Sequence, residues 1–285
     1  MIMTNLEQFM QKTGLSGASI ARSLGVSTAT VSLVKNGKTE KIAQTVLNKF
    51  SDFIRNYTSQ TGAVVSNVQS TSDLKMIEFT LHEMVVAQEM GSIFGKAGSG
   101  KTTAIKHFCQ SHPEAILIET TPFFTARGLL KEILAGQGEK EASGSATEMI
   151  HRSVSLFKKS EQILIIDEAE NLTTNNLEAI RRIHDFSSVP IALVGTYALV
   201  QNLKGRHGDL NQLSGRIMHT WEMKGLDKTD LTQLFGEFGK LINIITKDTR
   251  RATSIFRKAQ RLSQLQNEPL TAQHIRMAAQ TAILN

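Results

Sequence analysis

The sequence predicts a mixed α/β protein with a doubly wound parallel sheet at its centre, a small all-α domain before it and a helical lid after it. In the middle of the chain, short apolar runs alternate with helical patterns, as expected for strands that helices cover on both faces. Before them, residues 4–57 read as consecutive short helices with one tight turn. We expect four parts: a helix-turn-helix domain (1–58), a linker (59–72), the α/β core (73–224) and the lid (225–285).

The composition is that of a globular protein. Of the 285 residues, 40% are hydrophobic and 20% are charged. The single Cys109 excludes an intramolecular disulfide and fits a reducing compartment. The first residues, MIMTNLEQFMQK, lack the pattern of a signal peptide, and no later stretch approaches the roughly 18 apolar residues of a membrane span. We therefore expect a cytoplasmic protein that is neither secreted nor embedded in a membrane.

The positive charge lies at the two ends of the chain. The formal net charge is +6. Residues 1–58 carry 7 basic and 3 acidic side chains and residues 226–285 carry 9 and 5, whereas residues 59–225 carry 16 and 18. Both flanking parts therefore suit a polyanionic partner such as nucleic acid, although a solvated basic surface would give the same counts.

The segment from Gly17 to Gly37 has the pattern of a helix-turn-helix. A small residue, Ala21, stands where two helices would cross closely, and Gly25 stands where the turn needs a positive φ. Ser27 is expected to cap the second helix, which Asn36-Gly37 would end. The apolar residues expected inside are Ile20, Ala21, Leu24, Val31 and Val34. An ordinary helical hairpin is the alternative, but the spacing favours a DNA-binding module.

The second helix of such a module enters the major groove with its first turns leading. The residues that would then face DNA are Ser27, Thr28, Ala29, Ser32, Lys35 and Asn36. Except for Asn36, these are not the side chains that discriminate strongly between bases. We therefore expect weak sequence preference and salt-sensitive binding through the phosphates.

Residues 58–72 are polar and small with no helical period, which is typical of a flexible linker. A helix over 73–90 is expected next, followed by a short strand, Ser92 to Phe94. That strand enters GKAGSGKTT, and a helical pattern follows at once, so the phosphate-binding P-loop motif stands in its strand–loop–helix setting. Its residues are Gly95, Lys96, Ala97, Gly98, Ser99, Gly100, Lys101, Thr102 and Thr103.

The chemistry of this loop is the binding of a nucleotide triphosphate. Glycines let successive N–H groups face the phosphates at the positive end of a helix. Lys101 would reach the β- and γ-phosphates, and the Thr102 hydroxyl would ligate Mg²⁺. The sequence therefore predicts ATP and Mg²⁺ as cofactors.

A second buried strand, Ile163 to Ile166, ends in Asp167-Glu168. Asp167 would hold Mg²⁺ and Glu168 would act as the general base on the attacking water, although acidic pairs also begin helices. Further strands are expected at 115–119 and 190–194, the latter ending at Gly195-Thr196. Because parallel strands bind ligands at their carboxyl ends, all these polar residues should meet at one rim of the sheet.

The phrases GKAGSGKT, ILIIDEAE and LVGT resemble the AAA+ ATPases. With the preceding helix-turn-helix and the phrases TPFFTA and LSGRI, nearly the whole chain is similar to the family of the phage Mu B transposition protein and related transposon ATPases. The resemblance implies an ATPase that assembles as a homo-oligomer or filament on double-stranded target DNA. It also implies a transposase as the partner that this DNA-bound form recruits and activates, and the bacterial host cytoplasm as the compartment.

The resemblance assigns three further positions. Thr196 would sense the γ-phosphate, where the family pattern has Asn, and Arg216 in LSGRI would reach the nucleotide of a neighbouring subunit. A surface salt bridge is the alternative for Arg216. The second sensor arginine normally stands in a Gly-x-x-Arg phrase, which DTRRATSIFRKAQRL lacks. Arg251 is the candidate there, and the same basic cluster suits DNA or a solvated lid equally.

AAA+ proteins that load on DNA line a channel with loops of the core. The resemblance therefore makes candidates of residues 121–131, with Arg127 and Lys131, and of residues 204–207, with Lys204 and Arg206. Two other functions remain open. A nucleotide-gated transcriptional regulator would need strong sequence preference and paired half-sites. A helicase loader would bind a helicase and form little filament on duplex DNA.

Overall fold

The computed structural model describes residues 6, 10, 17–36, 38, 42–61, 70–204 and 211–281. The chain divides into two compact units, Met1–Gln69 and Ser70–Asn285, which are taken one at a time. Among the described residues, no helix is both long and apolar enough to span a bilayer.

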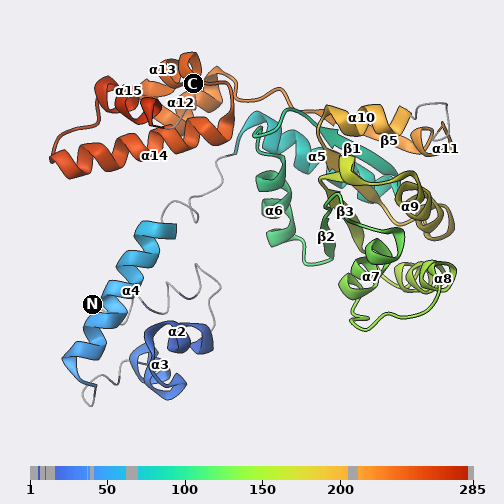
Figure 1. Ribbon diagram of the computed structural model, residues 1–285, viewed down its shortest axis with the longest axis horizontal. Coiled ribbons are helices and arrows are strands. Elements are labelled where there is room, and N and C mark those ends of the chain that lie inside the picture. Colours follow the sequence, from blue (N-terminus) through green and yellow to red (C-terminus); the bar gives the residue numbers. More distant parts are fainter. Residues whose placement is uncertain are drawn as a thin grey trace. The chain divides into compact units, whose positions relative to one another are not determined.

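The first unit is helical, as predicted (Figure 1). Gly25 joins two of its helices with a φ of +65°, and Ser27 caps the second by accepting a hydrogen bond from the main-chain nitrogen of Thr30 at 3.1 Å. Asn36 ends that helix, and Gly37 lies outside the described residues. The helices are α2 (Gly17–Leu24), α3 (Thr28–Lys35) and α4 (Gln44–Thr61), and their core contains Leu6, Ile20, Ala21, Val31, Val34, Leu47 and Phe50.

The linker prediction was wrong at its start, because α4 continues to Thr61. Residues 58–61 are polar, but a helix that already exists extends through such residues without a new nucleation cost. Residues 62–69 lie outside the described part. The next helix, α5 (Ser72–Ala87), is shorter than predicted: Gln88, with a φ of +55°, ends it before the first strand.

The second unit contains, in its described part, a five-stranded parallel sheet with the order β2-β3-β4-β1-β5. The parallel sheet is confirmed, and four of its strands lie where the sequence predicted them. The last strand, an edge strand beside β1, was missed, because its sequence IMHTWE has no apolar run and none of its residues is fully buried. The strands are β1 (Met90–Phe94), β2 (Ala115–Glu119), β3 (Ile163–Asp167), β4 (Ile191–Gly195) and β5 (Ile217–Glu222).

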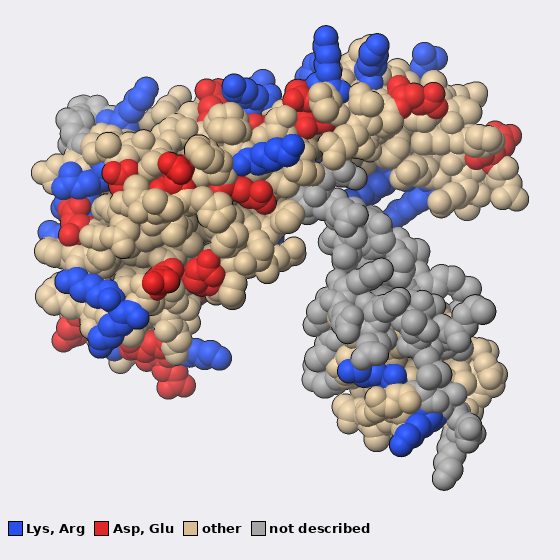
Figure 2. All heavy atoms as spheres, turned by 180° about the vertical axis from the view of Figure 1, so that it is seen from behind, with Lys and Arg blue, Asp and Glu red and all other residues tan. Residues whose placement is uncertain are grey.

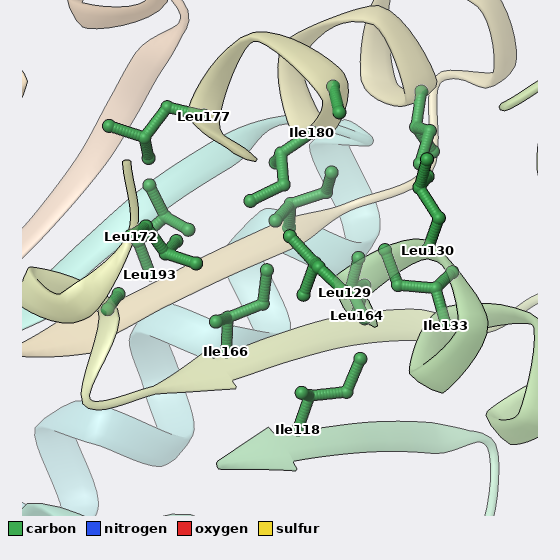
Figure 3. Close-up of a cluster of buried hydrophobic side chains, with 14 of the residues drawn as sticks. Ile118, Leu129, Leu130, Ile133, Leu164, Ile166, Leu172, Leu177, Ile180 and Leu193 are labelled. Atoms are coloured by element: carbon green, nitrogen blue, oxygen red, sulfur yellow. The ribbon is translucent and has the colours of Figure 1, made fainter. Parts of the chain in front are cut away.

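Helices and strands of the core share one apolar cluster. Figure 3 shows Ile118 of β2 and Ile166 of β3 together with Leu129, Ile133 and Ile180 from the helices that pack on the sheet. The apolar runs of the strands therefore pack against the covering helices in a shared core. The core helices are α6 (Lys101–Ser111), α7 (Ala126–Gly136), α8 (Ala146–Phe157), η1 (Ala169–Asn171), α9 (Thr174–Ser187), α10 (Tyr197–Lys204) and α11 (Asn211–Ser214).

The residues after β5 form a helical lid with a core of its own. Leu231, Phe235, Ile242, Ile255 and Ile275 are buried together there. The elements are α12 (Lys228–Phe235), η2 (Gly236–Phe238), α13 (Gly239–Ile245), α14 (Thr249–Gln266) and α15 (Ala272–Gln280).

The connection between sheet and lid is held by a buried carboxylate at the start of α5. Asp73, only 4% exposed, accepts hydrogen bonds from Trp221 Nε1 at 3.2 Å and from the main-chain nitrogens of Lys224 at 3.1 Å and Gly225 at 2.7 Å. Replacing Asp73 with alanine leaves these donors without their acceptor. We expect destabilisation by about 2–4 kcal/mol.

The midpoint of urea unfolding measures this effect. Glu161→Ala is the control, because this glutamate is exposed and its loss should change stability by less than about 0.5 kcal/mol. Equal midpoints for the two variants would contradict a structural role for Asp73.

Candidate nucleotide-binding site

The loop between β1 and α6 has the backbone of a phosphate cradle. Gly98 and Gly100 have φ values of +76° and +104°, which L side chains rarely adopt. Gly100 is the N-cap of α6 and has no side chain to occupy the first N–H groups of that helix. Those donors and the positive end of the helix therefore face the space where an anion would bind.

Lys101 is the cation of this loop. Its side chain is almost fully buried, and Nζ donates to the main-chain oxygens of Gly95 and Lys96, both at 3.0 Å. Burial lowers the pKa of Lys101, and the nearby carboxylates of Glu170, Asp167 and Glu168 act in the opposite direction. The ammonium is thus held inside the loop by weak neutral acceptors that a phosphate could replace.

Thr102 and Asp167, the two residues expected to ligate Mg²⁺, contact each other. Thr102 Oγ1 donates to Asp167 Oδ2 at 2.7 Å, although the two residues come from α6 and β3. Asp167 is buried, and its second oxygen accepts from the main-chain nitrogen of Glu168 at 2.9 Å. A hydroxyl and a carboxylate are the hard oxygen ligands that Mg²⁺ prefers. In the described part of the chain no group of three or more His, Cys, Asp or Glu side chains could hold a metal, so phosphate and water would supply the other ligands.

Glu168 stands at the turn directly after β3. Its φ is +55°, and the turn is fastened by Thr120 Oγ1, which donates to the main-chain oxygens of Asp167 at 3.0 Å and Glu168 at 2.7 Å. Partial burial raises the pKa of Glu168, and the charges of Glu170 and Asp167 raise it further. A carboxylate with a raised pKa is a better proton acceptor, which suits a general base.

Thr196 lies at the same rim of the sheet. It follows β4, and the register pairs Phe94 with Gly195 and Glu119 with Asp167, so the ends of β1, β2, β3 and β4 lie level. The structure therefore brings together the start of the P-loop, Asp167 and Thr196, which are distant from one another along the chain.

Arg216 lies at the other end of the sheet. It precedes Ile217, which pairs with Met90 at the amino end of β1, whereas the P-loop follows the carboxyl end. Its Nε binds Asp185 Oδ1 at 2.9 Å, with the side chain 47% exposed. In a single chain Arg216 therefore forms the surface salt bridge that was the alternative reading, and it lies away from its own P-loop.

The lid approaches the P-loop through the start of α14, where Arg251, the predicted second sensor, and its neighbour Arg250 lie. The main-chain nitrogen of Arg250 donates to Gly98 O at 3.2 Å, and the carboxylate of Asp248, the N-cap of α14, lies against Gly98. The charge of Arg250 also lowers the pKa values of Lys101 and Glu168. The main-chain nitrogen of Arg251 donates to that same Asp248 carboxylate at 2.8 Å. Arg250 therefore joins Arg251 as a candidate for the second sensor.

Exchanging each arginine for alanine separates the two candidates. Arg250→Ala should weaken ATP binding by about 10-fold, since a charge-assisted contact with phosphate is lost. Arg251→Ala is the matched control on the same helix turn and should change it by less than about 2-fold. Titration with a fluorescent ATP analogue measures both affinities, and a larger loss in Arg251→Ala would identify Arg251 as the second sensor.

The proposed DNA-contacting residues of the first unit share one exposed surface. This surface consists of the N-cap and outer face of α3, with Ser27, Thr28, Ala29, Ser32, Lys35 and Asn36. Small polar side chains predominate there. The surface can therefore approach a duplex closely.

In the second unit, the expected loop with Arg127 and Lys131 is mostly helix. Thr125 caps α7 by accepting from the main-chain nitrogen of Gly128 at 3.0 Å, and both basic residues lie on the exposed face of that helix. Lys204 is the exposed last residue of α10, and Arg206 lies outside the described residues. Figure 2 shows side chains of both signs of charge over the core and on the lid. The helix α14 carries basic side chains and no acidic one: Arg250, Arg251, Arg257, Lys258 and Arg261.

Two regions of the chain match known domain families. Residues 85–203 match the AAA domain, and residues 5–55 match the Cro/C1-type HTH DNA-binding domain. These ranges contain the P-loop and the strands β1 to β4 in the first case and the helices α2 and α3 in the second.

Two relatives are similar over most of the chain. The Mu-like prophage FluMu DNA transposition protein B of Haemophilus influenzae is 26% identical over 210 residues, which cover 72% of each chain. The ATP-dependent target DNA activator B of Escherichia phage Mu is 22% identical over 241 residues, which cover 81% of this chain and 75% of that protein.

Solved structures share the fold. The ORC2 protein of Aeropyrum pernix, in ADPNP and ADP complexes, has a TM-score of 0.56 at 14% identity and covers 77% of this chain and 71% of its own. A Walker-type ATPase of Pyrococcus abyssi has a TM-score of 0.53 at 16% identity and covers 74% of this chain and 72% of its own.

Proposed function

Because this chain is a Mu B-like AAA+ ATPase with an N-terminal helix-turn-helix domain, we propose that it assembles with ATP on target DNA and there activates a transposase. The observation that carries the proposal is the meeting of Lys101, the Thr102–Asp167 pair and Glu168 at one rim of the sheet, in a chain that also has a DNA-binding domain. The names of the two relatives, a DNA transposition protein and a target DNA activator, support the biological setting.

Each side chain of the rim has a part in hydrolysis. The P-loop N–H groups and Lys101 would bind the phosphates, and Thr102 and Asp167 would hold Mg²⁺, which would supply positive charge to the phosphate oxygens. Glu168 accepts the proton of the attacking water. Thr196 donates to the γ-phosphate, and Arg250 contributes positive charge from the lid.

The position of Arg216 supports assembly. An arginine at the amino end of the sheet cannot reach the P-loop at the carboxyl end of its own chain, but it can reach the P-loop of a copy stacked on that face. Arg216 would then exchange its partner Asp185 for a phosphate of the neighbouring nucleotide, which is also an anionic acceptor and can bind the guanidinium through two hydrogen bonds. The complete site would form only in a homo-oligomer or filament, and hydrolysis would release the protein from DNA.

Binding to duplex DNA is expected to depend little on sequence. The exposed surface of α3 offers mainly Thr28, Ala29 and Ser32, which read bases weakly. Phosphate contacts from basic residues of both units would supply most of the affinity, and these are Lys35, Arg127, Lys131, Lys204 and Arg206.

The test is binding to random-sequence duplex DNA with ATP, with ADP and without nucleotide, at two salt concentrations, with electron microscopy of the bound species. Tight, salt-sensitive coating of any sequence with ATP alone supports the proposal. Binding to one operator, or binding indifferent to nucleotide, would replace it with a helix-turn-helix transcriptional regulator. Discrete rings that bind a helicase and form no filament would favour a helicase loader.

A further inference from the structure

The third acidic residue of the phrase DEAE, Glu170, connects two segments of the site. It lies in η1, directly after β3, and is half-buried. Both of its carboxylate oxygens lie 3.2 Å from the main-chain nitrogen of Thr196, which donates to them. Its main-chain oxygen accepts a hydrogen bond from Nδ2 of Asn202, a residue of α10, at 2.9 Å. Glu170 therefore fastens the turn after β3 to the junction of β4 and α10.

The residue before Thr196 leaves room for this carboxylate. A Cβ on Gly195 would overlap Oε2 of Glu170, and it would also approach Leu199 of α10 to 3.1 Å. Gly195 has no positive φ, so no turn requires a glycine there. The space that the missing side chain leaves is occupied by Glu170.

The contact leaves the Thr196 hydroxyl able to donate. The main-chain N–H of Thr196 is engaged by Glu170, and Oγ1 accepts from the main-chain nitrogen of Ala198 at 3.3 Å. An oxygen that accepts from the start of a helix still has its own proton for another acceptor. Glu170 also lies near enough to Lys101 and Glu168 for its charge to raise the pKa of both.

We propose that Glu170 is a positioning residue for ATP hydrolysis, whose carboxylate holds the Thr196 main chain so that the Thr196 hydroxyl is aimed at the γ-phosphate. A carboxylate is suited to this task, because a charge-assisted hydrogen bond is stronger than a neutral one. The inference rests on the proposed role of Thr196 as the sensor. In addition, the residue that orients the sensor comes from the segment directly after β3, which also contains the proposed base Glu168.

The first part of the experiment compares two substitutions of Glu170 by steady-state phosphate release. Glu170→Ala should lower kcat by roughly 10- to 100-fold and leave KM nearly unchanged, because misplacement of the sensor affects the reaction more than binding. Glu170→Gln keeps an oxygen that accepts from Thr196 N and should restore most of kcat. Glu161→Ala, an exposed glutamate before β3, is the control and should match the parent.

The outcomes of this comparison are distinct. A kcat for Glu170→Gln as low as that for Glu168→Gln would overturn the inference, because the charge of Glu170 would then be needed as a base. Unchanged kcat in Glu170→Ala would overturn it also. The thermal midpoint of each variant shows whether a low kcat comes from loss of the fold. Glu170→Gln keeps the shape of the side chain and its contact with Thr196 N, so its midpoint should match that of the parent.

A double-mutant cycle tests whether Glu170 acts through Thr196. Thr196→Ala removes the hydroxyl but keeps the main-chain N–H that donates to Glu170. If the inference is right, the double variant is no slower than Thr196→Ala alone. Additive losses would overturn it. Unchanged kcat in Thr196→Ala would instead refute the sensor role itself, so the two failures are separable.

Discussion

Replacing Lys101 with alanine is expected to abolish ATP-dependent binding to DNA and to weaken ATP binding by roughly 100-fold. Lys101 is the buried cation of the P-loop, and its ammonium is held by the carbonyls of Gly95 and Lys96, in reach of phosphates bound to the same loop. Without it, the negative charge of the phosphates would meet Asp167 and Glu168 with less compensation. Titration with a fluorescent ATP analogue and DNA-binding assays with and without ATP measure the two effects.

Lys106→Ala is the matched control for this variant. Lys106 lies on the same helix but is 52% exposed and pairs with Glu119 at 2.6 Å, away from the loop. ATP affinity should change by less than about 2-fold. Lys101→Ala removes a charge that is costly to bury. The thermal midpoint of this variant should therefore not fall below that of the parent. Full ATP-dependent DNA binding by Lys101→Ala would show that the nucleotide acts at another site.

Replacing Glu168 with glutamine is expected to lower the rate of hydrolysis by roughly 100- to 10,000-fold while ATP still binds. Glutamine has the same shape but cannot accept the proton of the attacking water. Since the turn is fastened through main-chain atoms by Thr120, the fold should be unaffected. The ATP-bound protein should therefore remain on DNA.

Two measurements check this second prediction. Phosphate release gives the turnover, and fluorescence anisotropy after addition of competitor DNA gives the rate of dissociation. Glu161→Gln, the same exchange at an exposed position, should behave as the parent does. ATP turnover that survives in Glu168→Gln would exclude this residue as the base. Rapid dissociation of this variant from DNA in the absence of turnover would show that dissociation does not require hydrolysis.

The sequence by itself determined the features that depend on neighbours along the chain. The P-loop is a fixed spacing of glycines before Lys101, and the strand that ends at Asp167 is a continuous apolar run. The turn at Gly25 and the cap at Ser27 are equally local, because each needs only a φ value or a hydrogen bond within a few residues. Spacing and apolar period therefore sufficed for the two kinds of domain.

Only the tertiary structure decided the features that depend on residues distant in the chain. The edge strand β5 exists because β1 offers it hydrogen bonds, and its sequence has no apolar run to reveal it. The approach of α14 to Gly98 brings Arg250 to the P-loop, and the contact from Glu170 to Thr196 spans 26 residues. Contacts between residues distant in the chain depend on how the helices pack on the sheet. This packing produces no periodic pattern in the sequence of either segment.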